Sequence, residues 1–261
     1  MSIAGTLALA ATLAASWTLP RTAEVKERGP RTYRFTNLYT ATGPAGEVVQ
    51  RHQLTAEYTR GLPGGEVAWR DVVARVAQGP TDPLPAGERR EFMEGLRYPR
   101  GSGRLFEPDF FRGFPPAAVH ERNLVWDVAM LEAFGERQFP HLRLNQPYQV
   151  ARDQDLALPG IGSFQNRDVR LVWVGRSRRN GVDCAVIDYT AFFNPLRIDA
   201  GGVRIAGLSH YWGQIWVSTS TRMVEYATIR EVVYGELKLP GQEAAQPMHV
   251  FRESVLEPAP R

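Results

Sequence analysis

The chain has 261 residues, 43% of them hydrophobic and 23% charged, which is the balance of an ordinary globular protein. Its formal net charge is only +3, and its arginines are interspersed with Asp and Glu without forming a basic run. This pattern argues against electrostatic capture of a nucleic acid. The single cysteine, Cys184, lies in an apolar run, so no internal disulfide is possible and we expect a buried thiol.

The N-terminal segment is apolar. Residues 1–18 carry no charge and consist mainly of alanine and leucine, and charged residues begin after Pro20. This length is typical of the apolar core of a signal peptide, with small residues placed for cleavage near Trp17. We therefore predict that residues 1–20 are a signal peptide and that the protein is exported to the periplasm or cell envelope. A signal peptide usually opens with Lys or Arg, which this segment lacks, so a retained membrane anchor stays open as the alternative.

Strand patterns dominate the region that follows. Residues 32–39, 48–58 and 67–76 are rich in β-branched and aromatic side chains, which favours strands. Glycine and proline mark turns between them at residues 43–46 and 61–65. These segments predict consecutive antiparallel hairpins.

A different composition marks residues 78–122, which hold many prolines and glycines and predict an insertion. It is either a mobile functional loop or an excursion packed against the domain by its phenylalanines. The clearest helix follows over Asn123–Phe134, where Asn123 is placed to cap it and Gly135 to end it. Four apolar side chains repeat on one face of this helix: Leu124, Val128, Leu131 and Phe134.

The C-terminal half predicts two long hairpins. Residues 169–174 and 182–189 flank the dipeptide Asn180-Gly181, the strongest short signal for a hairpin with a type I′ turn. The second hairpin covers residues 209–234, with a two-residue turn at Ser220-Thr221. The first turn predicts the cross-strand pairs Arg178 with Asp183, Val174 with Ile187, and Trp173 with Asp188.

These elements predict one domain over residues 21–256, ending in a strand at residues 248–256 and a loose tail at residues 257–261. The fold class is mainly β with one helix. We expect a strongly curved antiparallel sheet, or half-open barrel, with the helix against its concave face.

Common catalytic and cofactor motifs are absent from the sequence. It has no phosphate-binding loop ending in Gly-Lys-Ser/Thr and no complete dinucleotide fingerprint. Its histidines never occur at metal-ligand spacing, and it has no Cys-x-x-Cys pair. We therefore predict neither a cofactor nor a metal site.

One face of the second hairpin is a candidate site. The two-residue turn pairs Trp216 with Glu225, Trp212 with Ile229, and His210 with Glu231, all on one face. His210 and Glu231 would be a catalytic proton-transfer pair, since the carboxylate raises the basicity of the imidazole. The alternative is an ordinary core with a cross-strand ion pair. The candidate ligand-binding residues are Trp212, Trp216, Glu225 and Trp126 on the helix.

The segment from Gly207 to Val217, Gly-Leu-Ser-His-Tyr-Trp-Gly-Gln-Ile-Trp-Val, leads into Arg-Met-Val-Glu-Tyr-Ala-Thr from Arg222 to Thr228. Together with the apolar start and successive hairpins, it resembles exported bacterial proteins of the periplasmic lipoprotein-carrier type. The resemblance implies a half-open barrel whose concave side is plugged by a helix. The chain is also similar to uncharacterised exported β-rich proteins, whose resemblance implies no activity.

Three functions follow from these observations. The first is a binding or carrier protein outside the cytoplasm, with a lipid or other apolar ligand between the sheet and the helix. The second is a hydrolase of a glycan or ester that uses His210 and Glu231. The third is an accessory subunit with an envelope or membrane complex as its partner, which would touch the membrane only through a retained N-terminal anchor.

Overall fold

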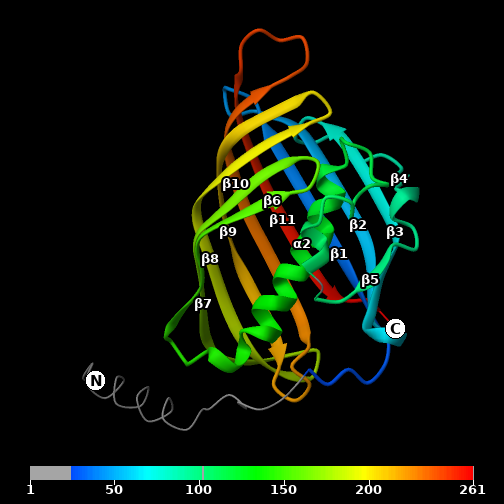
Figure 1. Ribbon diagram of the computed structural model, residues 1–261, viewed down its shortest axis with the longest axis vertical. Helices are drawn as coiled ribbons and strands as arrows, with labels where there is room; N and C mark the ends of the chain where they lie inside the picture. The colour runs from blue at the N-terminus through cyan, green and yellow to red at the C-terminus, as the bar shows by residue number, and fades with distance from the viewer. Residues whose placement is uncertain (1–24, 102, 261) are drawn as a thin grey trace, which may run out of the picture.

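The computed structural model describes residues 25–101 and 103–260 (Figure 1). The predicted signal peptide at residues 1–20 lies outside the described residues. Most of the described chain forms one large antiparallel sheet. Its strands are β1 (Arg31–Thr42), β2 (Val48–Leu62), β3 (Glu66–Gln78), β4 (Glu88–Arg89), β5 (Arg97–Pro99), β6 (Pro147–Leu158), β7 (Gly162–Arg179), β8 (Val182–Ala200), β9 (Val203–Ser218), β10 (Val224–Lys238) and β11 (Gln246–Pro258).

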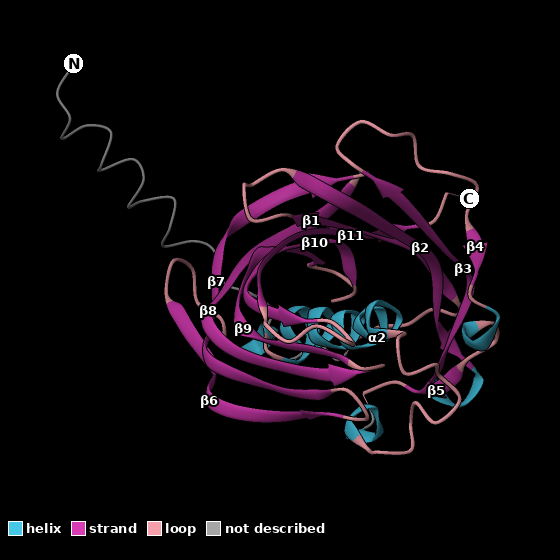
Figure 2. Ribbon diagram, turned by 90° about the horizontal axis from the view of Figure 1, so that it is seen from above, coloured by secondary structure: helices cyan, strands magenta, loops and turns pink. Residues whose placement is uncertain are grey.

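The sheet joins two meanders. Its strand order is β4-β3-β2-β1-β11-β10-β9-β8-β7-β6, and β5 also pairs with β3. The antiparallel pairing of β1 with β11 brings the two ends of the domain together. The sheet bends around helix α2 (Val119–Glu132) without closing into a barrel (Figure 2). This confirms the predicted fold class of a strongly curved antiparallel sheet with a helix against its concave face.

The helix and its flanking turns differ in detail from the prediction. Helix α2 begins at Val119, inside the predicted insertion, so Asn123 lies in the helix and does not cap it. The chain continues past Glu132 through a wider turn, η4 (Ala133–Arg137). Gly135 therefore does not end the helix. A Cβ there would lie 2.9 Å from Cγ2 of Ile215, so glycine allows close contact with β9.

The insertion packs onto the domain. It holds β4, β5 and the short turns η2 (Glu91–Met93) and η3 (Gly103–Phe106). Trp69 of β3 donates from Nε1 to Oη of Tyr98 at 3.0 Å, and both side chains are buried. The Phe111 ring meets the Trp126 ring of α2 edge to face, with 5.2 Å between centroids. Of its phenylalanines, Phe111 and Phe114 are buried, whereas Phe106 is 43% exposed. The remaining short helical turns are η1 (Pro63–Gly65) and η5 (Phe139–His141).

The hairpin β7–β8 has the predicted turn but not all of the predicted register. Asn180 and Gly181 have positive φ angles of 49° and 78°, and Arg178 pairs with Asp183 as expected. A bulge at Val174 then shifts the alignment, so Trp173 pairs with Ile187. The predicted pairs of Val174 with Ile187 and Trp173 with Asp188 were wrong. The bulge keeps Trp173 buried at 2% exposure and leaves Val174 at 39% on the outside.

The hairpin β9–β10 contains a second bulge, at Glu225. Residues 219–223 separate its strands, which is a longer turn than the predicted Ser220-Thr221 pair. After the bulge every residue is displaced by one position relative to the predicted alignment. The buried Glu225 carboxylate accepts from Nη1 of Arg31 at 2.8 Å, so the bulged residue makes a long-range ion pair with β1. The observed pairs are Trp216 with Tyr226, Trp212 with Arg230, His210 with Val232, and Tyr211 with Glu231.

One whole strand and the end of another were also missed. Strand β6 was not predicted because many of its side chains are exposed and polar. Its sequence therefore lacks the regular alternation of apolar and polar residues that a half-buried strand shows. Strand β11 takes in Glu257 and Pro258 of the predicted tail, and Ala259 donates its amide to the carbonyl of Thr32 at 3.0 Å. Among the described residues, no helix is both long and apolar enough to span a bilayer.

Candidate ligand-binding site

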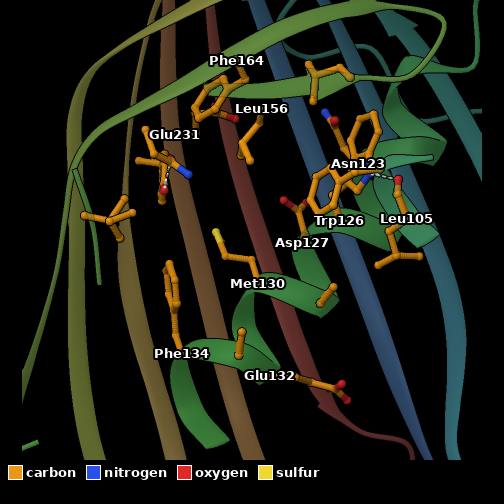
Figure 3. A pocket seen from close by; sticks show the side chains of 18 of the residues that line it. Leu105, Asn123, Trp126, Asp127, Met130, Glu132, Phe134, Leu156, Phe164 and Glu231 are labelled. Atoms are coloured by element: carbon orange, nitrogen blue, oxygen red, sulfur yellow. Dashed lines mark hydrogen bonds between the residues drawn. The ribbon is translucent and has the colours of Figure 1, made fainter. Parts of the chain in front are cut away.

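A cavity of about 1080 Å³ lies between α2 and the concave face of the sheet (Figure 3). Met130 and Phe134 project from the helix toward it, whereas Glu132 points away from them. Trp126 is oriented at its wall by an Nε1 hydrogen bond to the carbonyl of Leu105, at 3.1 Å. The sheet contributes apolar side chains from six strands: Val150 and Leu156 (β6), Phe164 (β7), Leu196 (β8), Ile205 (β9), Val233 (β10) and Val250 (β11).

Helix α2 carries apolar side chains on two faces. One face packs into the core and includes Leu124, Val128 and Leu131, which are at most 1% exposed. The other face borders the cavity with the half-buried apolar side chains Trp126, Ala129 and Met130, and with the polar side chains His120, Asn123 and Asp127. A helix that merely covers a sheet has a polar outer face, whereas this face of α2 also presents apolar side chains to the cavity.

A charged cluster borders the cavity between α2, β10 and β11. Arg252 is 5% exposed and donates from Nη1 to Oδ2 of Asp127 at 2.7 Å. Its Nε lies 2.9 Å from Oε2 of Glu231. The other oxygen of Glu231 accepts from Oγ of Ser209 at 2.5 Å. The Tyr39 ring completes the surroundings, with its centroid 5.7 Å from the guanidinium carbon. These three charged side chains link the helix to the two sheet strands behind it.

Burial dominates the electrostatics of this cluster. It raises the pKa of Asp127 from 3.8 to about 6, because desolvation penalises the carboxylate more than Arg252 stabilises it. Two carboxylates share one guanidinium here, so the ionised cluster carries an unbalanced negative charge.

A second charged cluster fixes the C-terminal end of α2 to the other half of the sheet. Buried Arg60 of β2 donates from Nη1 to Oε1 of Glu132 at 2.9 Å and to Oε1 of Glu136 at 2.5 Å. Arg100 donates to the second oxygen of Glu136 at 2.6 Å, and Tyr58 donates to Glu132 at 2.9 Å. Burial raises the pKa of Glu132 to about 7. This cluster ties the C-terminal end of the helix to β2 and to Arg100.

The structure does not form the predicted catalytic pair. His210 pairs with Val232 and lies on the convex face, where its Nε2 is 3.1 Å from Oη of Tyr234. Glu231 is one residue out of the predicted alignment, points to the concave face and lines the cavity. Because neighbouring residues of a strand face opposite sides, the displacement by one separates the two side chains across the sheet.

The predicted ligand-binding residues separate in the same way. Trp126 lines the cavity. Trp212, Trp216 and Glu225 are not part of its lining. The Trp216 ring instead lies under the guanidinium of Arg179, 5.6 Å from its carbon to the centroid. Two of the six predicted site residues, Trp126 and Glu231, therefore border the cavity.

Several lining residues were missed from the sequence, notably Asp127, Met130, Phe164 and Arg252. Asp127 carried a usable signal, because it is a charged residue within the apolar stretch from Leu124 to Leu131. Nothing in the sequence distinguished Arg252, since many strands of this chain contain arginines and most of those are exposed.

Metal binding finds no support in the described part of the chain, where no three His, Cys, Asp or Glu side chains gather. The nearest arrangement is a pair of histidines. His52 and His120 meet edge to face with 4.7 Å between ring centroids. Burial lowers their pKa values to about 4 and about 3, so both rings are neutral near pH 7.

Comparisons with known proteins show a likeness in fold. No protein-family model matches the chain, and no curated protein matches its sequence. A solved structure of lipovitellin, described by its lipid–protein interactions, is similar with a TM-score of 0.52 and 13% identity. The match covers 91% of this chain but only 26% of lipovitellin, so the chain corresponds to about a quarter of that protein. At this identity the likeness concerns the fold.

Proposed function

We propose that the protein binds or carries an apolar ligand, such as a lipid, in the cavity between α2 and the sheet. The observation that carries this proposal is a space of about 1080 Å³ whose lining, taken as a whole, is mainly apolar. Cavities of this size suit drug-sized or larger ligands, and apolar walls supply the driving force for binding.

Two further observations support the proposal. The cavity-facing side of α2 presents Trp126 and Met130, apolar side chains that a ligand would cover. Lipovitellin, whose structure is described by its lipid–protein interactions, has a similar fold over 91% of this chain. This likeness in fold is consistent with a lipid as the ligand.

The proposed location is outside the cytoplasm, in the periplasm or cell envelope. It rests on the uncharged apolar segment at residues 1–18. N-terminal sequencing of the native protein tests it. A mature chain that starts near Trp17 is the expected result, and a chain that retains the whole segment would contradict cleavage.

Native mass spectrometry of protein purified without detergent tests the function. We expect a reproducible mass above that of the polypeptide, which disappears on denaturation, and extraction of an apolar compound from the same sample. A ligand-free protein that also fails to bind fluorescent fatty-acyl probes would refute the proposal.

A matched pair of variants on strand β6 places the ligand. Ala151 lines the cavity, whereas Ala157 is exposed and lies outside its lining. Ala151→Trp fills part of the space and should reduce probe binding about tenfold or more, since the ligand loses apolar contact area. Ala157→Trp adds the same side chain to the same strand and should leave binding unchanged. Equal effects of both substitutions would place the ligand elsewhere.

A further inference from the structure

The charged cluster on the cavity wall indicates which polar group the ligand carries. We infer that the ligand's polar end is a hydrogen-bond donor, a hydroxyl or an ammonium group, that lies against Asp127 and Glu231, and that a carboxylate or phosphate is disfavoured there. This inference rests on the proposed function and specifies the ligand class of the same cavity.

Charge balance is the first step of the argument. Asp127 from α2 and Glu231 from β10 extend toward the same space (Figure 3), and both line the cavity. Arg252 is the cation between them, 2.7 Å from Asp127 and 2.9 Å from Glu231. The polar neighbours Ser209 and Tyr39 are neutral, so the ionised cluster keeps one uncompensated negative charge. An unbalanced charge in apolar surroundings is costly unless a donor or a cation meets it.

The hydrogen-bonding capacity of the carboxylates is the second step. Two carboxylates together offer about eight lone-pair sites. The donors directed at them include Arg252 and the hydroxyl of Ser209. A ligand hydroxyl or ammonium would add donors that the cluster can accept. A ligand carboxylate would add a third negative charge to a guanidinium that two carboxylates already share.

The C-terminal end of α2 provides the contrasting location. Arg100 also lines the cavity there, but it is engaged by Glu136 at 2.6 Å. Arg137 lines the same end and is exposed, so its charge is solvated. An anionic head group would have to bind at this end, away from Asp127 and Glu231.

Three ligands with one chain length separate these possibilities: dodecanol, dodecylamine and dodecanoate. Each is titrated at about pH 8, where the amine is cationic and the acid anionic, against a fluorescent apolar probe bound to the full protein. We expect dodecanol and dodecylamine to displace the probe at concentrations about tenfold lower than dodecanoate, as hydrogen bonds to charged groups are worth that factor. Dodecanoate that competes as well as dodecanol, or better, overturns the inference while leaving the proposed function intact.

Glu231→Gln gives the matched variant, since it removes the excess charge while keeping the shape of the side chain. The preference for dodecylamine over dodecanoate should fall about tenfold. Glu253→Gln is the control, because Glu253 is exposed beside Arg230 on the outside of the sheet. An unchanged preference in Glu231→Gln, or a dodecanoate preference that Arg137→Gln abolishes, overturns the inference. Failure of all three ligands to displace the probe refutes the proposed function itself.

Discussion

The two halves of the curved sheet have the same alternation of inward and outward side chains, but the surroundings of their inward side chains differ. In β1–β3 the inward side chains are packed by protein, and Phe35, Leu54 and Trp69 are all 0% exposed. In β6–β11 the inward side chains divide: Leu171, Ile187 and Ile215 are also 0% exposed, whereas others, such as Leu156 and Val250, are half-buried and border the cavity. Helix α2 belongs to one core with both regions and leaves the cavity open beside part of β6–β11.

The difference shows what makes a binding site in this fold. An inward apolar side chain in either half satisfies the same strand pattern, so the pattern alone does not distinguish core from cavity. The distinction arises from the position of α2, which the Arg60 and Arg252 clusters fix against both halves. Four expected outcomes test this comparison.

The largest effect is expected at Arg252. Arg252→Met leaves Asp127 and Glu231 without their shared cation at the cavity wall, and should lower the free energy of unfolding by about 3–5 kcal/mol. Arg230→Met is the control on the neighbouring strand. Arg230 and Glu253 are 58% and 48% exposed, and losing such a pair costs about 0–1 kcal/mol. Urea denaturation measures both values, and similar losses would contradict the role of the cluster.

A pair of leucine substitutions compares the two halves directly. Leu54→Ala should destabilise the protein by about 2–5 kcal/mol, because it opens a hole in close-packed core. Leu156→Ala removes the same atoms from the wall of an existing cavity, and should cost less than about 1 kcal/mol. The measurement is urea denaturation of ligand-free protein. If the losses were equal, the C-terminal half would be packed as tightly as the N-terminal half.

The pH dependence of stability reports the burial of Asp127. Its pKa is about 6 in the folded protein and 3.8 without burial, so between about pH 7 and 5 the folded state takes up a proton that the unfolded state does not. The free energy of unfolding should therefore rise as pH falls through this range. Asp127→Asn should lose this part of the rise, whereas the contribution of Glu132 remains in both proteins. An identical pH profile for the variant would contradict the raised pKa.

The smallest effect is expected on the convex face. His210→Ala removes a side chain that contacts Tyr234 outside the cavity, and should change stability by only about 0.5 kcal/mol or less. Ligand binding should be unchanged. Loss of probe binding in this variant, with the fold intact by circular dichroism, would show that the outer face contributes to the site.

The sequence predicted the fold more closely than the site for a definite reason. Hairpin turns are local, so Asn180-Gly181 specified a turn without reference to the rest of the chain. Register depends on every residue between the turn and the pair in question. One extra residue at Glu225, held there by Arg31 from β1, moved His210 and Glu231 to opposite faces.

Local patterns by themselves determined the mainly β character, the succession of hairpins and the presence of one helix near its observed place. Only the tertiary structure decided where the bulges fall, how α2 is oriented and which apolar side chains enclose space instead of filling it. These features depend on contacts between residues far apart in the chain, such as Arg252 with Asp127 and Arg60 with Glu136. Hydrophobic periodicity records that a side chain points inward, but it carries no information about what meets it there.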